Sequence, residues 1–209
     1  MAYDNSARAA AARATRTKVL AAAREAFLTR GYAGTTIREV AQAAGVSQET
    51  VYKRFGGKAG LLKDVYDVAM AGDEEPVPIS ARPEAIAVRD AADPAAAAAA
   101  YARLAGFLTG RAGPLMRIVL SARGGDPDLD AFMATVDKER LVGATSAVNA
   151  WAERGWLRRG LDADRARDVL WTLNSPAVWV LLGERGWSRP EYEAWIAEGL
   201  LALILEADA

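Results

Sequence analysis

The run TTIREVAQAAGVSQETVYKRFGGK, residues 35–58, contains the start and stop signals of two short helices. Thr36 followed by Glu39 predicts a capping box, in which the hydroxyl and the carboxylate accept hydrogen bonds from backbone amides at the helix start. The next apolar residues recur at helical spacing and indicate one buried face: Ile37, Val40, Ala41 and Ala44. Gly45 predicts the end of this helix, because glycine adopts the left-handed conformation without a Cβ clash.

A second short helix follows the turn. Ser47 is a favourable N-cap, and Val51 and Phe55 predict the buried face of the helix. This spacing turns four side chains outward: Gln48, Glu49, Tyr52 and Lys53. Two helices joined in this way form a helix-turn-helix, whose second helix lies in the major groove of DNA. The alternative is an ordinary helical hairpin, with Glu49 and Lys53 as a surface ion pair.

The outward side chains carry groups that match DNA. Gln48 can bond adenine at two atoms, and Lys53 can donate to O6 and N7 of guanine. Thr50 can contact a thymine methyl group or a phosphate oxygen, and the Tyr52 hydroxyl can reach the DNA backbone. Lys58 stands at the start of the next helix, where free amides and a lysine together favour a phosphate group.

The order of these residues resembles the N-terminal domain of the TetR family of transcriptional regulators. The resemblance covers residues 15–66 and rests on Gly31-Tyr32, Thr35-Thr36 and the run VAQAAGVSQETVYKRFGGKAGLL. It implies an all-helical homodimer that represses transcription and leaves its operator when a small ligand binds the C-terminal domain. It also implies DNA contacts by these residues: Thr36, Arg38, Ser47, Gln48, Glu49, Thr50, Tyr52, Lys53 and Lys58.

Two features of the second helix depart from what the resemblance implies. Lys53-Arg54 replaces an aromatic–histidine pair that is common in the family, and the added charge should strengthen contacts to the DNA backbone. The operator sequence becomes less predictable for the same reason. Glu49 brings a carboxylate near phosphates, which is favourable if it accepts from a cytosine amine. The other explanation is that Glu49 interacts with the helix dipole.

The composition excludes several kinds of chemistry. The chain has no cysteine and no histidine, which removes disulfides, thiol chemistry, the commonest metal ligand and the commonest general base. The acidic residues at 126–130 do not form a calcium loop, because Ala131 occupies the place of the required glycine. We therefore expect no enzyme, no catalytic or metal site and no cofactor. No apolar run approaches the roughly 20 residues of a membrane span, so a cytoplasmic protein without a membrane partner is expected.

Charge is unevenly distributed along the chain. Residues 1–60 carry ten Lys and Arg against four Asp and Glu, a net charge of +6. Residues 61–209 carry sixteen against twenty-three, a net charge of −7. A basic N-terminal segment suits a nucleic-acid partner, because phosphate neutralisation supplies most of the non-specific affinity.

Helical patterns extend over most of the chain, so the predicted fold class is all-α: an N-terminal three-helix helix-turn-helix domain and a larger C-terminal helical domain. Residues 1–14 are expected to form a mobile arm, residues 15–60 the DNA-binding domain, and residues 61–209 the effector-binding and dimerisation domain. Arg8 and Arg13 could contact DNA, although simple disorder of a chain end is the preferred explanation. Helices are expected over residues 15–30, 58–71, 84–92, 94–109, 114–123, 128–154, 163–184 and 190–207, with a kink at Pro176.

The last two predicted helices are apolar on more than one face, which indicates burial on their own domain and on a second copy. Such a homodimer would hold two DNA-binding domains about one DNA turn apart, as a palindromic operator requires.

The C-terminal domain is also expected to hold an effector pocket, because small-ligand sites are mostly apolar with a few placed polar groups. The candidate lining residues are Tyr101, Met116, Arg117, Asn149, Trp171 and Asn174. The alternative is that the aromatic residues among them belong to the core, as most buried side chains do. An apolar or aromatic small-molecule effector is expected. Two functions stay open: a ligand-responsive repressor, and a DNA-binding dimeric activator or architectural protein without an effector.

Overall fold

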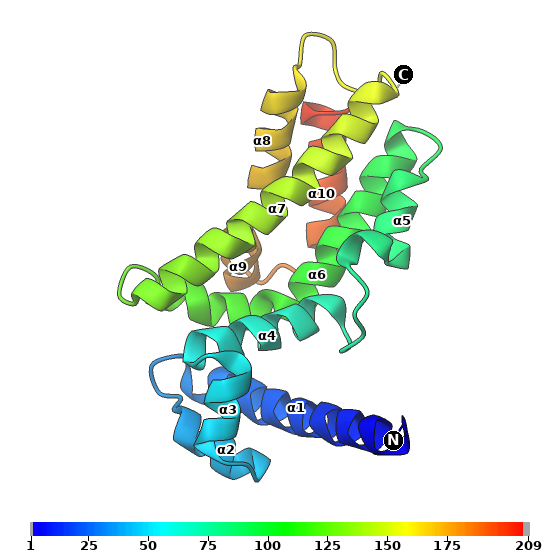
Figure 1. Cartoon of the computed structure of the whole chain (residues 1–209). Helices are drawn as coiled ribbons and strands as arrows, with labels where there is room; N and C mark the ends of the chain where they lie inside the picture. The colour runs from blue at the N-terminus through cyan, green and yellow to red at the C-terminus, as the bar shows by residue number, and fades with distance from the viewer. Residues whose placement is uncertain (1, 207–209) are drawn as a thin grey trace. The chain divides into compact units, whose positions relative to one another are not determined.

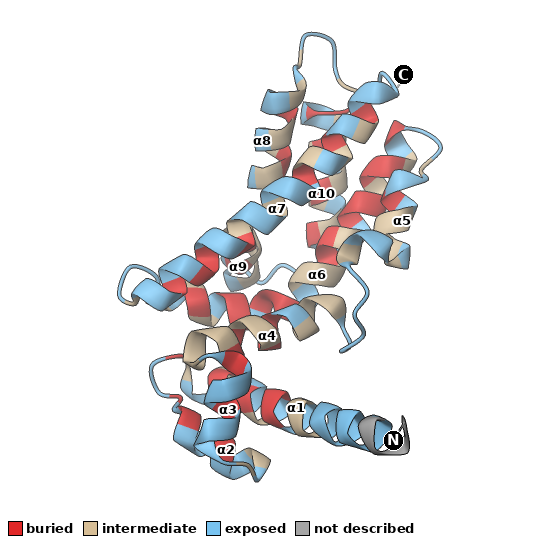
Figure 2. Cartoon of the chain, viewed as in Figure 1, coloured by how far each residue is buried: buried red, intermediate tan, exposed pale blue. Residues whose placement is uncertain are grey.

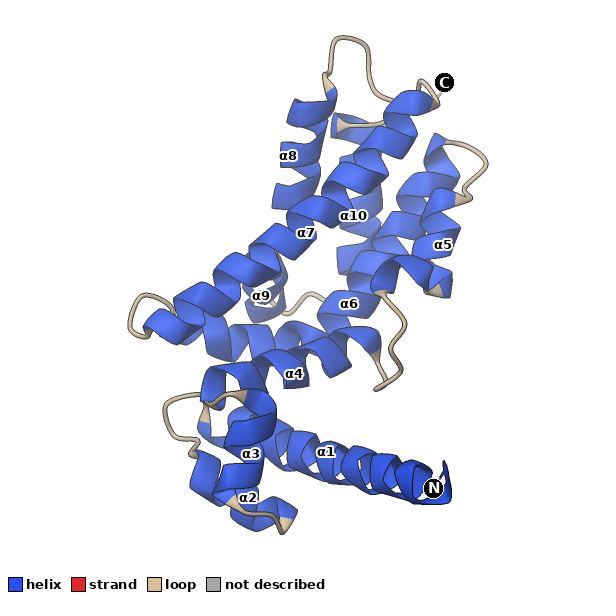
Figure 3. Cartoon of the chain, in the orientation of Figure 1, coloured by secondary structure: helices blue, strands red, loops and turns tan. Residues whose placement is uncertain are grey.

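All regular elements in the described part of the chain are helices, which confirms the all-α fold class (Figure 3). The computed structural model describes the backbone of residues 2–206 and the side chains of residues 6–206. The helices in chain order are α1 (Ala2–Arg30), α2 (Ile37–Ala44), α3 (Gln48–Phe55), α4 (Lys58–Ala71), the 3-10 turn η1 (Ile79–Ala81), α5 (Pro83–Arg89), α6 (Pro94–Ala122), α7 (Pro127–Glu153), α8 (Ala163–Leu173), α9 (Pro176–Glu184) and α10 (Arg189–Leu203), as labelled in Figure 1. None of the helices in these residues combines the length and the apolarity needed to cross a membrane.

The chain divides into two compact units. The head unit contains the residues up to Glu74 together with Ile118–Phe132, and the body unit contains Glu75–Arg117 and the residues from Met133 onward. Helix α4 packs against α1 and therefore belongs structurally to the head unit. The expected functional domains, residues 15–60 and 61–209, remain a proposal.

The N-terminal segment is part of a long helix. α1 runs from Ala2 to Arg30 without interruption, so the arm expected over residues 1–14 is wrong for residues 2–14; Met1 lies outside the described residues. Alanine is the best helix former, and adding a residue to an existing helix avoids the cost of nucleation. Residues 6–14 are all exposed, so no apolar stripe marked the extension in the sequence (Figure 2).

Two prolines behave differently from expectation. Pro114 was expected to begin a helix but lies inside α6, which also joins the two helices expected over residues 94–109 and 114–123. Pro176 was expected to kink one helix, but it begins α9 instead, with Ser175 as its N-cap. The proline ring clashes with the Cβ of the residue before it, and this clash pushes that residue out of the helical region. Gly113 has no Cβ and can stay helical, whereas Ser175 is extended at ψ 134.

The core of the head unit lies where α1, α2, α3 and α4 meet. α1 contributes Val19, Leu20, Ala23 and Phe27, and the next three helices contribute Ile37, Val40, Ala41, Val51, Phe55, Leu61, Leu62, Val65 and Tyr66. Aromatic contacts extend this core: Phe27 stacks on Tyr32 with ring centroids 6.1 Å apart, and Tyr66 meets Phe132 edge to face at 5.4 Å. Helix α3 is therefore packed through Val51 and Phe55 against the core of the head unit.

The core of the body unit is built around the alanine-rich start of α6. Ala97 and Ala98 are fully buried and Ala100 nearly so, so this run packs closely against neighbouring helices. Large side chains in the same cluster include Trp151 of α7 and Tyr192, Ile196 and Leu200 of α10. Small residues on one helix thus leave room for large residues on its neighbours.

Candidate nucleic-acid interface

Hydrogen bonds define both ends of α2. The Thr36 hydroxyl accepts from the Glu39 amide at 3.3 Å, and the Glu39 carboxylate accepts from the Thr36 amide at 3.2 Å, so the predicted capping box is confirmed. The Thr36 hydroxyl also donates to the Glu39 carboxylate at 2.8 Å, and this bond, with the bond from the Thr36 amide and with Arg30 nearby, holds the pKa of Glu39 below its usual range. Gly45 ends the helix at φ 68, and its amide donates to the Gln42 carbonyl at 3.2 Å. The geometry of the turn between α2 and α3 is therefore set locally.

Helix α3 presents a polar outer face. The Ser47 hydroxyl accepts from the Thr50 amide at 3.1 Å, and Val51 and Phe55 are buried as predicted. The outer face carries the exposed side chains of Gln48, Glu49, Thr50, Tyr52, Lys53 and Arg54. Within residues 6–206, Glu49 and Lys53 form no ion pair, contrary to what the alternative helical hairpin proposed.

Three more predicted DNA contacts lie at the ends of the neighbouring helices. Thr36 and Arg38 are exposed at the start of α2. Lys58 begins α4, whose N-terminus has no side-chain cap, so backbone amides there are free to donate to a phosphate oxygen. The Lys58 ammonium donates to the Tyr32 carbonyl at 2.9 Å and lies 4.1 Å from the centre of the Tyr32 ring. Lys58 therefore also fastens the turn after α1.

Sequence reasoning missed two arginines of the head unit as part of the site. Arg16 of α1 and Arg54 of α3 line a recess of about 480 Å³ with Thr50, Lys53 and Asp64. Arg16 donates to Asp64 of α4 at 3.1 Å and to Glu74 at 2.7 Å. These partners lie 48 and 58 positions from Arg16, so no local pattern indicates them. The charge of Arg54, noted as a departure from the family pattern, was the one available signal.

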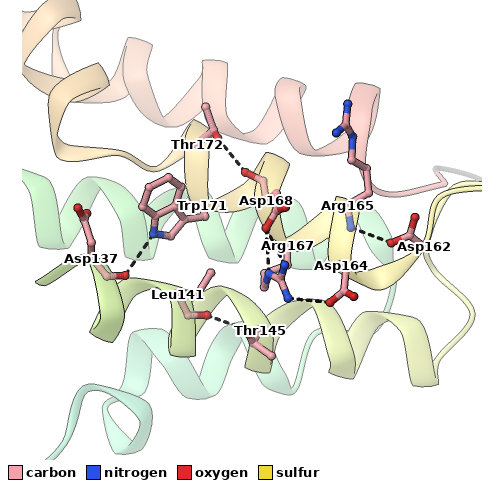
Figure 4. Close-up of polar contacts among 10 residues, drawn as sticks. All are labelled: Asp137, Leu141, Thr145, Asp162, Asp164, Arg165, Arg167, Asp168, Trp171 and Thr172. Carbon is pink, nitrogen blue, oxygen red and sulfur yellow. Dashed lines mark hydrogen bonds and ion pairs between the residues drawn. The ribbon is translucent and has the colours of Figure 1, made fainter. Parts of the chain in front are cut away.

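The body unit brings three of the six predicted ligand contacts together. Asn174 caps the end of α8, and its Nδ2 donates to the Tyr101 hydroxyl at 2.5 Å. Arg140, which sequence reasoning missed, donates to the Asn174 side-chain oxygen at 2.8 Å and lies 4.8 Å from the centre of the Trp171 ring. The Trp171 indole donates to the Asp137 carbonyl at 3.3 Å (Figure 4).

The other three predicted ligand contacts lie elsewhere. Arg117 and Asn149 are exposed and belong neither to this hydrogen-bonded group nor to the core cluster around it. Met116 is fully buried in α6 but is not a member of that cluster. Helical spacing alone could not separate these positions, because α6 and α7 each bury residues on more than one side.

Tyr192 completes the group as a buried phenol. Its side chain is fully buried and its hydroxyl has no hydrogen-bond partner in the described residues. Burial raises the pKa of Tyr192, and burial likewise raises the pKa of Tyr101 to about 12. Both phenols therefore keep their protons at neutral pH and can donate to an acceptor atom of a ligand.

Tyr192→Phe is expected to stabilise the protein without ligand by about 1–3 kcal/mol, because a buried hydroxyl without a partner carries an unrecovered desolvation cost. Tyr101→Phe is the matched control and should lower the free energy of unfolding by about 1 kcal/mol, since it removes the acceptor of the Asn174 amide. Urea unfolding measures both. A loss of stability in Tyr192→Phe would mean that the hydroxyl has a partner.

The capped helix pair with its polar outer face defines a DNA-binding protein of the helix-turn-helix class. Residues 19–65 match the family model described as bacterial regulatory proteins of the TetR family. This match identifies the N-terminal domain, residues 19–65, as a DNA-binding domain of the TetR type, and solved TetR-family regulators share the fold of the chain. The resemblance noted in the sequence is thereby confirmed.

Relatives extend over both units of the chain. YdeS of Bacillus subtilis, an uncharacterized HTH-type transcriptional regulator, is 27% identical over 158 residues, which are 75% of this chain and 74% of YdeS. Two solved structures at 19% identity share the fold. FadR of Bacillus subtilis in complex with stearoyl-CoA has a TM-score of 0.67 and covers 88% of this chain and 96% of its own. The SmeT–triclosan complex has a TM-score of 0.64 and covers 92% of both chains.

Proposed function

We propose that the protein is a repressor that binds palindromic operator DNA as a homodimer and leaves it when a small apolar or aromatic effector binds. The observation that carries the DNA-binding part is the outer face of α3. It is polar over its whole length, it is supported by a buried face, and both ends of the helix are capped. Such a helix fits the major groove with its side chains toward base edges.

The proposed roles of the DNA-contacting residues follow from their positions. Gln48, Glu49 and Lys53 are proposed to contact base edges, because they lie on the outer face of α3. Six residues are proposed to contact the DNA backbone or to position the helix: Thr36, Arg38, Ser47, Thr50, Tyr52 and Lys58. Tyr52 is 53% exposed, so its hydroxyl is accessible to the DNA backbone.

A homodimer is proposed from the C-terminal helices. Leu181 of α9 and Leu203 of α10 are 61% and 50% exposed, and Trp187 between these helices is 37% exposed. A second copy that covers these side chains would remove apolar area from water. Two-fold symmetry would then present two copies of α3 to the two halves of a palindrome.

The proposed effector site is the group of Tyr101, Trp171 and Asn174 with Arg140 and Tyr192. It combines aromatic walls with a few fixed polar groups, as small-molecule sites do. FadR and SmeT, which share the fold, form complexes with stearoyl-CoA and triclosan. An effector would release DNA by binding more tightly to the conformation that holds the two recognition helices at the wrong spacing.

The sharpest test is selection of bound fragments from genomic DNA, followed by binding measurements on the selected operator. Gln48→Ala should lower operator affinity about tenfold and leave the affinity for random duplex unchanged. Tyr52→Phe and Lys58→Ala should weaken binding to both DNAs, and Lys58→Ala should reduce the salt slope by about 1. Equal losses on operator and random DNA for Gln48→Ala would contradict its assignment to a base.

Because Lys58 also bonds to Tyr32, thermal unfolding of Lys58→Ala must be measured beside its DNA affinity. A thermal-shift screen with apolar and aromatic compounds tests the effector. Stabilisation that accompanies release from the operator supports the repressor. Operator binding that no compound affects would instead favour the activator or architectural protein without an effector.

A further inference from the structure

The recess beside α3 contains two cations without a protein partner. Lys53 and Arg54 are exposed, and neither forms a hydrogen bond or ion pair with any side chain in residues 6–206. Thr50 lies three and four positions before them, so the three side chains share one side of α3. This side faces a space of about 480 Å³, which is closed on other sides by Arg16 and Asp64.

Arg16 differs from these two cations because it is held by two carboxylates. Its guanidinium meets Asp64 at 3.1 Å and Glu74 at 2.7 Å, and its side chain is 21% exposed. Asp64 lies on α4 and Glu74 follows that helix, so these bonds tie α1 to α4 and to the segment after it. Asp64 lines the recess, whereas Glu74 does not.

The side chains of the recess suit a bound oxyanion such as phosphate, although the carboxylate of Asp64 competes with it for Arg16. Three cationic side chains and one hydroxyl line the space, and the Asp64 carboxylate accepts a hydrogen bond from Nη2 of Arg16. Arginine binds phosphate through two parallel N–H groups, and hydrogen bonds between charged partners are about twice as strong as neutral ones. The Thr50 hydroxyl is within 2.9 Å of the Ser47 hydroxyl and can donate to a phosphate while it accepts from Ser47.

We propose that this recess binds one phosphate group of the DNA backbone, and that Arg16 exchanges Asp64 for a phosphate oxygen when DNA binds. The inference rests on the proposed binding of α3 to duplex DNA. Arg54 binds the phosphate, the nearby charge of Lys53 adds to the attraction while its ammonium contacts a base edge, Arg16 turns its guanidinium toward the phosphate, and Glu74 keeps Arg16 close to α4. The tie between α1 and α4 is thus looser in the DNA-bound head unit, and Asp64 sets how much affinity Arg16 contributes.

Asp64→Asn is the decisive variant, because it keeps the shape of the side chain and removes the competing charge. Binding of a random-sequence duplex to the full chain is measured by fluorescence anisotropy over a range of salt. Asp64→Asn should tighten binding by roughly three- to tenfold on random and operator DNA alike. Glu25→Gln is the charge-matched control, since Glu25 is exposed on α1 about two and a half turns after Arg16 and therefore on the opposite side of the helix. It should change affinity little.

A double-mutant cycle distinguishes the exchange of the Arg16 partner from a general effect of removing a negative charge. Arg16→Gln alone should weaken binding and reduce the salt slope by about 0.9, the value for one phosphate contact. In the Arg16→Gln background the gain from Asp64→Asn should disappear. The same gain in both backgrounds, or an equal gain in Glu25→Gln, would overturn the proposal.

Arg54→Gln keeps the proposal testable if Arg16→Gln fails to fold. Arg54 is exposed, so this variant should unfold like the wild type and still lose about 0.9 from the salt slope. Lys18→Gln is its control, because Lys18 is exposed on α1 on the side away from Arg16. An unchanged slope in Arg54→Gln, or an equal loss in Lys18→Gln, would contradict a phosphate in the recess.

Inorganic phosphate distinguishes a backbone phosphate from a free anion. The side-chain Nε–H signal of Arg16 is followed by NMR while either duplex or inorganic phosphate is added at constant ionic strength. Duplex alone should move the signal. Movement by inorganic phosphate, with displacement of the duplex, would reassign the recess to a free anion. Failure of the wild type to bind any duplex at low salt would refute the proposed function itself, whereas binding without the Arg16–Asp64 coupling refutes only this inference.

Discussion

Gly60→Ala is expected to unfold the head unit and abolish DNA binding. A Cβ atom built on Gly60 would lie 1.9 Å from the Phe55 carbonyl oxygen and 3.1 Å from its carbon. Both are backbone atoms, so relief requires a shift of the end of α3 or of the start of α4. Overpacking of this kind costs about 1–3 kcal/mol where side chains can move, and we expect the upper part of that range or more. Phe55 also anchors the buried face of α3.

Gly143→Ala is the matched control for this substitution. Gly143 lies in α7 and nothing would stand within 4 Å of an added Cβ. Alanine there should stabilise the protein by about 0.5–1 kcal/mol through its higher helix propensity. Thermal unfolding and DNA binding of the two variants measure the contrast. Wild-type behaviour of Gly60→Ala would show that the junction of α3 and α4 adjusts without cost.

Arg140→Met should produce the second largest loss, about 2–3 kcal/mol of unfolding free energy, because it leaves buried acceptors without a donor. The Arg140 side chain is 11% exposed and pairs with Asp137 at 2.9 Å. It also donates to the Asn174 side chain and to the Trp171 carbonyl. The melting temperature should fall by roughly 5–10 °C for a protein of this size.

Arg117→Met is the control, because it removes an arginine that has no part in this group of hydrogen bonds. Arg117 is exposed, so the change should stay within about 0.5 kcal/mol. Arg140→Met should also weaken the binding of any effector that contacts Tyr101. Arg140 fixes the orientation of the Asn174 side chain, which in turn donates to Tyr101. Equal unfolding free energies for the two variants would remove Arg140 from the core of the proposed effector site.

These bonds join three helices of the body unit at one point. Arg140 lies on α7, Asn174 caps α8 and Tyr101 lies on α6. A ligand that accepts from Tyr192 or Tyr101 would therefore meet groups whose positions depend on all three. A ligand shifts a conformational equilibrium only by the difference between its affinities for the two conformations. We therefore expect the two conformations of the body unit to differ in the arrangement of this junction.

Local signals accounted for the helix-turn-helix. The capping box at Thr36, the left-handed Gly45 and the N-cap at Ser47 each act within a few residues, and all three occur as predicted. The helix expected over residues 58–71 has the same limits in the structure, and the one expected over 128–154 differs by one residue at each end. Short-range hydrogen bonds and helical periodicity are sufficient for such elements.

Local rules were insufficient at both prolines and at the N-terminus. The same residue type lies inside a helix at Pro114 and starts one at Pro176, because the preceding residue is glycine in one case and serine in the other. α1 extends back to Ala2 because alanine has a high helix propensity, although no apolar pattern in the sequence predicts a helix there. The last helix, expected over residues 190–207, already ends at Leu203, so its predicted C-terminus is wrong.

The amino-acid sequence alone indicated the resemblance to the TetR family, the limits of α3 and its outward side chains, since these follow from contacts within a few positions. Only tertiary structure revealed Arg16 between Asp64 and Glu74, and Arg140 between Asp137 and Asn174. The sequence around an arginine looks the same whether its side chain is solvated or paired with a carboxylate. Its partner is decided by which helices pack together, and that depends on burial summed over the whole core.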